Sequence, residues 1–595
     1  MNKAAIYHRT ESEYAFLYGD RDHLRLRLRT AKDDIKSVEV RHGSFIEAYH
    51  THWSENPGPQ MTKYLSTDIY DYWTIEITEL TDHMPSYAFI IEGVDGEKLL
   101  YGDHGLVEIS EEVLADTPAN FFRLPYMHDI DRVKIPEWVT HTVWYQIFPE
   151  RFGNGDKSND PKNVKPWNSD DHPGRDDYYG GDLQGIIDHL DHLSDLGING
   201  IYLTPIFKSP TNHKYATTDY LEIDPDFGDK NKFKELVDAA HSRGIKIMID
   251  AVYNHNGGAS FQWQDVLRNG EKSKFKDWFH IQSFPVYARK GKYDFKLDKN
   301  YDTFAFDKDM PKWNTANPEV IDYLLQVSTY WIEEFDIDAW RLDVANEVDH
   351  AFWRKFREAV TAKKKDFFIL GEIWHNSQPW LNGDQFDSVM NYSLSNGILN
   401  YFLKGEMTRE KFISDFNDQV MLYRDQTNQA VFNLLDSHDT ARIKTVADGN
   451  VDKVKSALSF LFLHPGTPDI YYGTEFGMEG ENDPDDRKPM VWDTSKQDLN
   501  MYEFTKNLIA LRKDFAPIIS NGTIHWGDDN QNGDQLEFIR NYKDSTLTSE
   551  FNLGENSIKV ASNGRKILLG NKYQIEGESV EIEQNGFVIF DGAND

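Results

Sequence analysis

The chain has 595 residues and a formal net charge of −35, from 99 acidic and 64 basic side chains. A surface this acidic excludes nucleic acid and anionic membranes as partners and favours a neutral ligand or a cation. Cysteine is absent, the first residues lack an apolar signal segment and no apolar run is long enough to span a membrane, so we expect a cytoplasmic protein.

The N-terminal part consists of short stretches in which apolar and polar residues alternate. Examples are HLRLRLRT (His23 to Thr30), YWTIEITEL and YAFIIEGV. Alternation of period two between polar turns is typical of antiparallel strands. Residues 1–122 are therefore predicted to form a β-sandwich.

The middle of the chain repeats a different unit, an amphipathic helix followed by an apolar strand. LQGIIDHLDHLSDLG precedes INGIYLTPI, and NPEVIDYLLQVSTYWIEEF precedes DIDAWRLDV. About eight such units predict an α/β fold, a parallel (β/α)8 TIM barrel over residues 123–513. A doubly wound open sheet is the alternative, but the strand number and the lack of a G-x-G-x-x-G turn disfavour it.

Two further segments complete the predicted organisation. An irregular, aromatic and charged stretch at about 256–312 is predicted to be an insertion after the third barrel strand. Residues 514–595 return to short strands such as QLEFIRNY and GFVIF, which predict a C-terminal β-sandwich.

Charged groups and imidazoles follow the predicted barrel strands, where the chemistry of such barrels takes place. Four strand ends contribute Asp250, Asn254, His255, Arg341, Asp343, Glu372, His438 and Asp439. Each of these has a structural explanation, as a helix cap or an ion-pair partner. Together they would bring like charges into one place without any gain in stability, so we predict a catalytic centre.

Glycosidic cleavage explains this set of side chains. A retaining glycosidase needs a nucleophilic carboxylate and a protonated acid about 5 Å apart. Asp343 lies beside Arg341 in the sequence, so we expect it to be ionised and to act as the nucleophile. Glu372 has apolar neighbours, so we expect its pKa to be raised, as an acid/base requires. Asp439 is left to stabilise the oxocarbenium-like state or to hold sugar hydroxyls.

Four segments in order, DAVYNH, AWRLDVANE, ILGEIW and LLDSHD, resemble the signature regions of the α-amylase family of glycoside hydrolases. GIYLTPIF and GTPDIYYGTEFG resemble two further regions, so the resemblance covers about residues 140–500. It implies that Asp343 is the nucleophile, Glu372 the acid/base and Asp439 the third carboxylate. It also implies that the sugar is held by Tyr215, His255, Arg341 and His438. Trp374, two positions after the acid/base, is predicted to stack on a sugar ring.

A narrower resemblance concerns the neopullulanase, cyclomaltodextrinase and maltogenic amylase group. MPKWN is similar to the M-P-K-L-N of that group, with Trp313 in place of leucine, and Ala339 stands where a glycine is usual. DPDDRKPMVWD resembles a stretch in which Asp483 and Arg487 would bind the donor-side sugar. The N-terminal part is similar to that group's starch-binding-like domain.

This narrower resemblance implies an activity and an assembly. The activity is retaining hydrolysis of α-1,4-glucosidic bonds in cyclodextrins, pullulan and maltodextrins, together with transglycosylation. The assembly is a homodimer in which the N-terminal domain of one chain covers the active site of the other.

A structural Ca²⁺ ion is predicted from NGDKSND and YYGGDL. These stretches supply oxygen-bearing side chains at Asn154, Asp156, Asn159, Asp160 and Asp182, and oxygen is the ligand that Ca²⁺ prefers. The alternative is a polar turn in which Asp182 is the N-cap of the next helix. The stretch also resembles the calcium loop of the same subfamily, in which Gly180 supplies a backbone carbonyl.

Two other functions are weighed against hydrolysis of α-1,4 bonds. A non-catalytic glycan-binding protein built on the same barrel is disfavoured because all three acids are present. An exo-acting α-1,6-glucosidase of the same family would lack the long N-terminal β-sandwich, and MPKWN also argues against it.

Overall fold

The computed structural model describes residues 1–18, 23–46, 53–78, 80, 83–115, 120–286, 299–305, 307–527 and 535–592. These form two compact units. One comprises residues 1–134 with 406–429 and 524–526, and the other comprises 135–405, 430–523 and 527–595. The predicted domain boundaries at 122 and 513 remain predictions.

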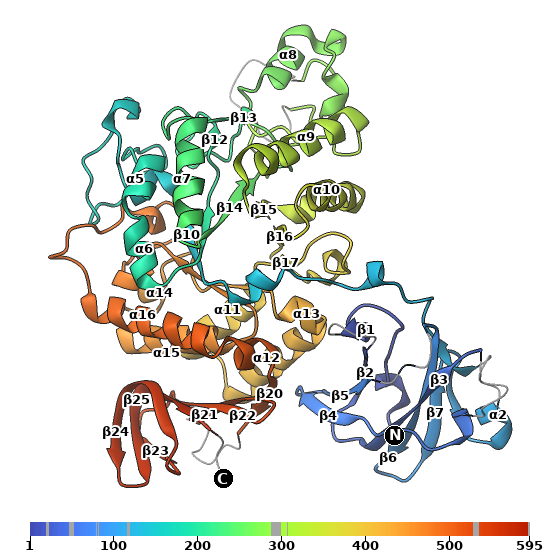
Figure 1. The fold of residues 1–595 in the computed structure, drawn as a ribbon. Helices are drawn as coiled ribbons and strands as arrows, with labels where there is room; N and C mark the ends of the chain where they lie inside the picture. The colour runs from blue at the N-terminus through green and yellow to red at the C-terminus, as the bar shows by residue number, and fades with distance from the viewer. Residues whose placement is uncertain are drawn as a thin grey trace. The chain divides into compact units, whose positions relative to one another are not determined.

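The first unit contains the predicted N-terminal sandwich, drawn in blue in Figure 1. Its first sheet has the strand order β1 (Ala15–Tyr18), β2 (His23–Ala31), β5 (Tyr70–Ile77), β4 (Thr62–Ser66). Its second sheet consists of β3 (Ile35–Ser44), β6 (Pro85–Gly93), β7 (Lys98–Gly102), β8 (Gly105–Glu108) and β9 (Phe122–Arg123). Leu24, Leu26 and Leu28 of β2 are fully buried and share one core with Val38 and Phe89 of the other sheet. Period-two burial of this kind is what joins two sheets into a sandwich.

Several short helical segments and one longer helix, α12, also belong to this unit. They are η1 (Lys3–Ala5), η2 (Trp53–Glu55), α2 (Glu111–Ala115), η3 (Asp129–Asp131), α12 (Arg409–Leu422) and α13 (Asp425–Asn428).

The second unit contains the predicted barrel, whose strands pair in parallel. In chain order the barrel strands are β10 (Trp144–Ile147), β11 (Gly200–Leu203), β14 (Lys246–Ala251), β15 (Ala339–Leu342), β16 (Phe368–Gly371), β17 (Ser388–Val389), β18 (Phe432–Asn433) and β19 (Thr467–Tyr471). A parallel bridge between Met390 and Phe432 closes the ring. Ala339 is fully buried in the barrel core, where its methyl group packs among aromatic residues. The (β/α)8 architecture is therefore confirmed.

Helices cover the outside of the barrel (Figure 1). The longer ones are α7 (Lys230–Ser242), α9 (Pro318–Phe335), α10 (His350–Lys363), α15 (Val451–Leu463) and α16 (Leu499–Asp514). The shorter ones are α4 (Pro149–Phe152), α5 (Leu183–Asp188), α6 (Leu190–Leu196), α11 (Tyr392–Ile398), η10 (Leu399–Lys404), α14 (Ile443–Val446) and α17 (Ala516–Asn521). Helix α6 ends at Gly197, whose φ of 97° is the left-handed conformation that favours glycine at a helix end.

Smaller elements lie in the connections of the barrel. The strands β12 (Phe207–Lys208) and β13 (Asp219–Ile223) pair antiparallel after β11. Single helical turns are η4 (Glu137–His141), η8 (Ala345–Glu347), η9 (Gln378–Trp380), η11 (Thr474–Phe476) and η12 (Asp485–Arg487).

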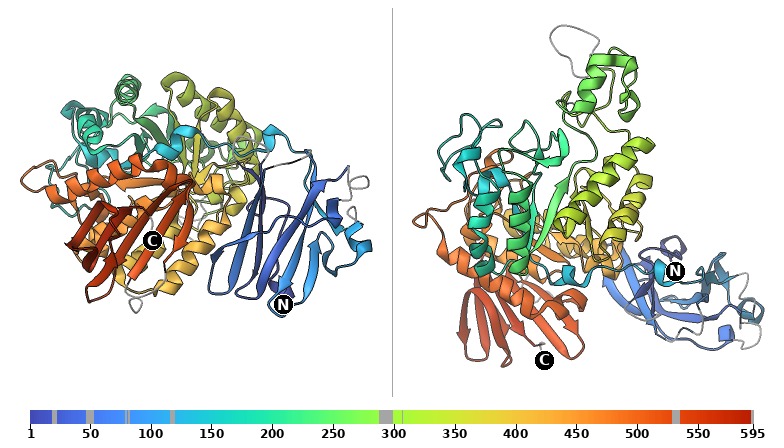
Figure 2. Two further views of the ribbon diagram at one scale, coloured as in Figure 1. Left: turned by 60° about the horizontal axis from the view of Figure 1, so that its bottom comes forward. Right: turned by 45° about the horizontal axis from the view of Figure 1, so that its top comes forward.

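The predicted insertion lies between β14 and α9. It contains α8 (Phe261–Asn269) and the short turns η6 (Gly270–Lys272) and η7 (Lys276–Trp278), which Figure 2 shows set apart from the barrel helices. Trp313 is buried there, with its ring stacked on Phe279 at 4.9 Å and its indole N–H donated to the Tyr220 hydroxyl at 3.2 Å. The tryptophan that replaces the expected leucine therefore fills an aromatic core inside the insertion.

The C-terminal strands form the predicted second β-domain. They are β20 (Thr523–Trp526), β21 (Gln535–Tyr542), β22 (Ser545–Asn552), β23 (Ile558–Ala561), β24 (Lys566–Glu576) and β25 (Ser579–Asp591). The long strand β25 pairs antiparallel with β22, β23 and β24, so one continuous sheet results. Val580, Ile582, Val588 and Phe590 of β25 form its buried core. Across the described residues, no helix is both long and apolar enough to cross a membrane.

Candidate active site

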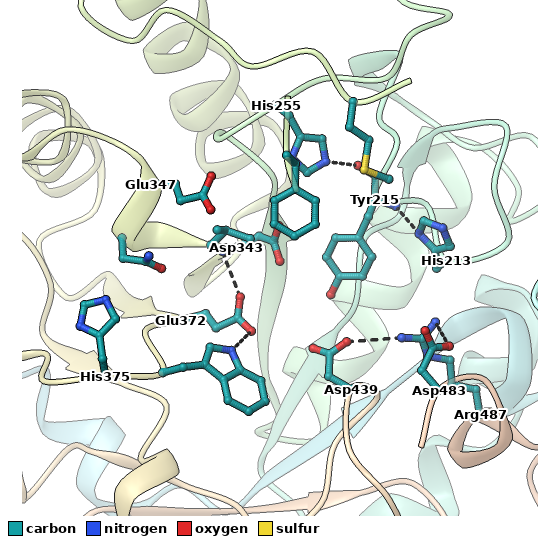
Figure 3. A pocket seen from close by; sticks show the side chains of 15 residues that line it. His213, Tyr215, His255, Asp343, Glu347, Glu372, His375, Asp439, Asp483 and Arg487 are labelled. Carbon is teal, nitrogen blue, oxygen red and sulfur yellow. Dashed lines mark hydrogen bonds and ion pairs between the residues drawn. The ribbon is translucent and has the colours of Figure 1, made fainter. Parts of the chain in front are cut away.

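A cavity of about 470 Å³ lies at the carboxyl ends of the barrel strands (Figure 3). All three predicted catalytic acids and most of the predicted sugar-binding residues line it: Asp343, Glu372, Asp439, Tyr215, His255, Trp374, Asp483 and Arg487. Segments far apart in the sequence are brought together there because parallel barrel strands all end on the same side.

Arg341, the third residue of β15, is fully buried beneath this cavity and bridges three carboxyl groups. Its Nη1 lies 2.7 Å from Asp343 Oδ1 and 2.9 Å from Asp250 Oδ2, and its Nη2 lies 3.0 Å from Glu372 Oε2. The predicted pair with Asp343 is therefore part of a larger cluster. Arg341 reaches the reaction centre through these acids and is not itself among the cavity-lining residues.

Asp343 directly follows β15 and is almost fully buried. Burial and the neighbouring carboxyls of Glu372 and Asp250 raise the pKa of Asp343 well above its usual value, and Arg341 only partly opposes them. Arg341 favours the ionised form of Asp343, as expected, but burial and the two neighbouring carboxyls outweigh it in setting the direction of the pKa. Burial has the largest effect, and the one guanidinium is in addition shared among three carboxyl groups.

Glu372 follows β16 and accepts hydrogen bonds on both oxygens. Oε2 receives the backbone N–H of Val344 at 3.0 Å, and Oε1 receives the indole N–H of Trp374 at 2.9 Å. The Trp374 ring is 52% exposed and stacks on Tyr392 with 3.7 Å between the ring centroids. One face of the indole is therefore covered by Tyr392, and its polar edge contacts the predicted acid/base.

Tyr215 and His438 form a stacked pair in one wall of the site, with 5.6 Å between the rings and 5° between their planes. The Tyr215 hydroxyl lies 2.5 Å from His438 Nε2 and donates to Asp250 Oδ2 at 3.1 Å. His438 is fully buried and is not among the residues that line the cavity. Burial, with Arg487 and Arg341 nearby, lowers its pKa well below the usual value, so the imidazole is neutral.

Arg487 joins the predicted donor-side residues to the third acid. Its Nη1 lies 2.8 Å from Asp483 Oδ1, and its Nη2 lies 3.3 Å from Asp439 Oδ1. Its Nε donates to the backbone carbonyl of His438 at 2.7 Å. Asp483, Arg487 and Asp439 therefore act as one charged wall of the cavity.

This arrangement coincides with two matches to family models. The catalytic domain of alpha amylase matches residues 146–522, and the N-terminal ig-like domain of alpha amylase matches residues 1–128. The chain belongs to the alpha-amylase family.

Two relatives within the alpha-amylase family are similar over nearly their whole length. The intracellular maltogenic amylase of Bacillus subtilis is 47% identical over 554 residues, which are 93% of this chain and 92% of that protein. The cyclomaltodextrinase of Geobacillus thermopakistaniensis is 46% identical over 601 residues, 99% of each chain. A solved structure named cyclomaltodextrinase superposes with a TM-score of 0.90 at 40% identity and full coverage of both chains.

Several residues of this alpha-amylase site escaped the sequence-based prediction. The cavity is also lined by His213, Met310, Val344, Asn346, Glu347 and His375, and by Phe304, whose stacking on a sugar the sequence left open. Asn346 and Glu347 lie inside the AWRLDVANE motif, and Phe304 stacks on His255 with 5.1 Å between the rings. Asp250, next to last in β14, was predicted to belong to the catalytic centre, but its contact with Arg341 was not.

The residues predicted to bind Ca²⁺ lie in one loop region at the start of the barrel. Asn154 Nδ2 donates to Asp160 Oδ1 at 2.7 Å, and a Cβ at Gly180, whose φ is 79°, would lie 2.4 Å from each of these atoms. The side-chain oxygens of Asn154 and Asn159 are buried without a hydrogen-bond partner. Two orphaned carbonyl oxygens beside carboxylates suit a hard cation.

Two of the predicted ligands also act as helix N-caps, the structural alternative to Ca²⁺ binding. Asp182 is the N-cap of α5, and its Oδ1 accepts the Gly185 N–H at 2.6 Å. Asp156 is exposed and caps η5 (Lys157–Asn159), with Oδ1 accepting from the Ser158 N–H at 2.9 Å. Within the part of the chain that is described, no group of three or more His, Asp or Glu side chains is arranged to hold a metal ion.

Proposed function

We propose that this member of the alpha-amylase family is a retaining α-glucan hydrolase. It cleaves α-1,4-glucosidic bonds in cyclodextrins, pullulan and maltodextrins, and it transfers glycosyl groups to sugar acceptors. The observation that carries the proposal is that Asp343 and Glu372 share the guanidinium of Arg341 below one cavity. This sharing favours the separation of about 5 Å of a retaining enzyme over the wider gap of an inverting one.

The three acids divide the reaction between them. Asp343 attacks the anomeric carbon while Glu372 gives its proton to the leaving glycosidic oxygen, which breaks the old bond as the glycosyl-enzyme bond forms. Glu372 then takes a proton from water, or from a sugar hydroxyl in transglycosylation, and that oxygen displaces Asp343. Asp439, held by Arg487, faces the cavity where positive charge develops on the sugar ring.

The electrostatics of the cluster support this sequence of events. The pKa of Asp250 is raised to about 6, chiefly by burial, and that of Asp343 is also raised. The cluster therefore retains a proton to higher pH than free carboxyls would. A sugar ring that becomes cationic in the transition state relieves the excess of negative charge, so the site stabilises that state most strongly.

A product profile by chromatography tests the proposal. Purified protein is incubated with β-cyclodextrin, pullulan and soluble starch, with Asp343→Asn as the control. We expect maltose and glucose from β-cyclodextrin, panose from pullulan and slow attack on starch. Rapid starch cleavage with β-cyclodextrin left intact would indicate an ordinary endo-amylase. If wild type forms no products, the protein is better explained as a non-catalytic glycan-binding protein.

A structural Ca²⁺ ion is part of the proposal. The residues that fit it best are Asn154, Asn159 and Asp160, with the backbone carbonyl of Gly180. Asp156 and Asp182 fit less well because their carboxylates already accept hydrogen bonds as helix caps. When bound, the ion would stabilise the fold of this loop. The chemistry assigned above to the three acids does not pass through it.

Removal of Ca²⁺ should lower the melting temperature. An excess of chelator is expected to reduce it by several degrees in the wild type, and added Ca²⁺ should restore it, because a ligand that binds only the folded state stabilises it. Asn154→Ala should melt at the lower temperature and respond to neither treatment. The melting temperature of Asp156→Ala, in the same loop, should still respond to chelator and Ca²⁺ as that of wild type does. If chelator leaves the melting temperature of wild type unchanged, the proposal of a bound Ca²⁺ ion is refuted.

The homodimer and the cytoplasmic location are proposed on the same family resemblance. The relative from Bacillus subtilis is named as intracellular, which supports the location. Sedimentation velocity at micromolar concentration tests the assembly, and a monomeric mass would contradict it.

A further inference from the structure

Gln146 is a buried polar residue near the end of β10 to which the mechanism above gives no role. Its side chain is fully buried, and its Nε2 lies 3.0 Å from Nδ1 of His438. Its amide oxygen Oε1 has no hydrogen-bond partner among the described residues. The amide is therefore hydrogen-bonded to the imidazole of His438, and it has two possible orientations toward that ring.

The opposite edge of the imidazole decides which ring nitrogen carries the proton. His438 Nε2 lies 2.5 Å from the Tyr215 hydroxyl and 3.2 Å from Asp439 Oδ2. A carboxylate has no proton to give, so when the tyrosine proton is donated to Asp250, Nε2 faces two acceptors. This arrangement assigns the proton to Nε2.

The protonated Nε2 determines what Gln146 has to do. The ring is neutral, so it carries one proton only, and Nδ1 is left as an acceptor. The amide N–H of Gln146 donates to it. The reverse orientation would bring a proton to Nδ1 and leave a bare Nε2 against Asp439, and it would also orphan a buried N–H, which is rarer than an orphaned carbonyl.

We propose that Gln146 is a positioning residue that holds His438 in the tautomer protonated at Nε2, and through it orients Asp439 and Tyr215 in the cavity. This inference rests on the proposed glycosidase function. The Nε2–H of His438 supplies a hydrogen bond to whichever of Tyr215 and Asp439 the bound sugar leaves free. The backbone carbonyl of His438 is held by Arg487, which fixes the ring from the main-chain side.

Two substitutions of similar size separate a tautomer role from a packing role. Gln146→Met removes the donor without adding charge, so the proton is free to move to Nδ1 and kcat on β-cyclodextrin should fall at every pH. We expect roughly a 10- to 100-fold loss, less than the roughly 10⁴-fold effect of a wrong tautomer in an enzyme whose imidazole transfers the proton itself.

Gln146→Glu should behave differently because its carboxylate accepts a proton from Nδ1. Below the pKa of the altered imidazole, the ring holds both protons and keeps its Nε2–H, so activity is largely retained. Above it, the single proton goes to Nδ1 and activity falls, which gives an alkaline limb at lower pH than in wild type. Besides the introduced carboxylate, the titratable and charged groups that act on this ring are Asp439, Arg487, Arg341, Glu372 and His213.

The relative activities of the two variants distinguish a positioning role of Gln146 from a packing role. If Gln146 only fills space, the buried glutamate should be the more damaging change at every pH, because burying a charge costs more than burying a thioether. A glutamate variant that is no better than the methionine variant at any pH, or a methionine variant with wild-type kcat and pH profile, would overturn the proposal. Melting curves of all three proteins establish that each is folded.

The same experiment distinguishes a failure of the positioning role of Gln146 from a failure of the glycosidase function. Wild type that releases maltose from β-cyclodextrin, with a methionine variant equally active, refutes the role of Gln146 alone. Wild type that releases no product refutes the glycosidase function and with it the positioning role.

Discussion

Replacing Asp343 with asparagine is expected to lower kcat on β-cyclodextrin by roughly 10⁴- to 10⁶-fold, the range seen when a covalent nucleophile is removed. An amide cannot form the glycosyl ester, and its shape preserves the hydrogen bond with Arg341. The KM should change little, because Tyr215, Trp374 and Arg487 still line the cavity. Initial rates of maltose release, measured over a range of substrate concentrations, give both constants.

The same variant is expected to melt at a higher temperature than wild type at neutral pH. Asp343, Asp250 and Glu372 share one cation, so removing one carboxyl relieves repulsion between buried like charges. The folded-state pKa of Asp343 is raised above its unfolded value, so the folded state binds more protons there and loses stability as pH rises through that pKa. The gain in the variant should therefore be largest at neutral pH and shrink on acidification.

Asp469→Asn is the matched control. Asp469 is another buried barrel carboxyl with a raised pKa, on β19, and it is not among the residues that line the cavity. Its replacement should leave kcat within about twofold of wild type, since only interactions with the transition state change the rate. A nucleophile role for Asp343 is ruled out if Asp343→Asn retains more than a few per cent of wild-type kcat.

The parts of the fold and site that follow from local sequence were predictable. Alternation in HLRLRLRT marked a strand because Leu24, Leu26 and Leu28 point into one core. Asp343 and Glu372 stand one residue beyond short buried strands, and a barrel requires such residues to meet at one face. Gly197 marked a helix end because only glycine readily adopts its left-handed conformation.

The parts that depend on contacts between distant segments were not predictable. The pKa of Asp343 depends on how many acids share Arg341, and that number follows from the register of β14, β15 and β16. Gln146 and Tyr202 lie within strands that read as ordinary core, and it is the order of the barrel strands that brings them beside His438 and Asp250. Asp156 is predicted as a ligand by composition, and composition does not show that its Oδ1 also accepts the N–H of Ser158.

Replacing Arg341 with methionine is expected to abolish activity and to destabilise the catalytic unit by about 3–5 kcal/mol, the usual cost of breaking a buried ion pair by removing one partner. Arg341 is fully buried, and its loss leaves Asp250, Asp343 and Glu372 without their shared cation. The melting temperature and the urea midpoint measure this loss. The melting temperature of Arg341→Lys should lie between those of wild type and Arg341→Met, because one ammonium cannot reproduce the forked hydrogen bonds of a guanidinium.

A second substitution distinguishes the loss of a cation from the loss of packing. Asp250→Asn in the Arg341→Met background removes one of the uncompensated carboxyls, so the double variant should melt above Arg341→Met alone. In a background that retains Arg341, the same change also removes a favourable ion pair, so its benefit should be smaller, and the difference between the two backgrounds is the coupling between the residues. Equal effects of Asp250→Asn in both backgrounds would mean that Arg341 acts mainly by filling space. In that case charge sharing would contribute little to the stability of the cluster, and burial would account for most of the raised pKa of Asp343.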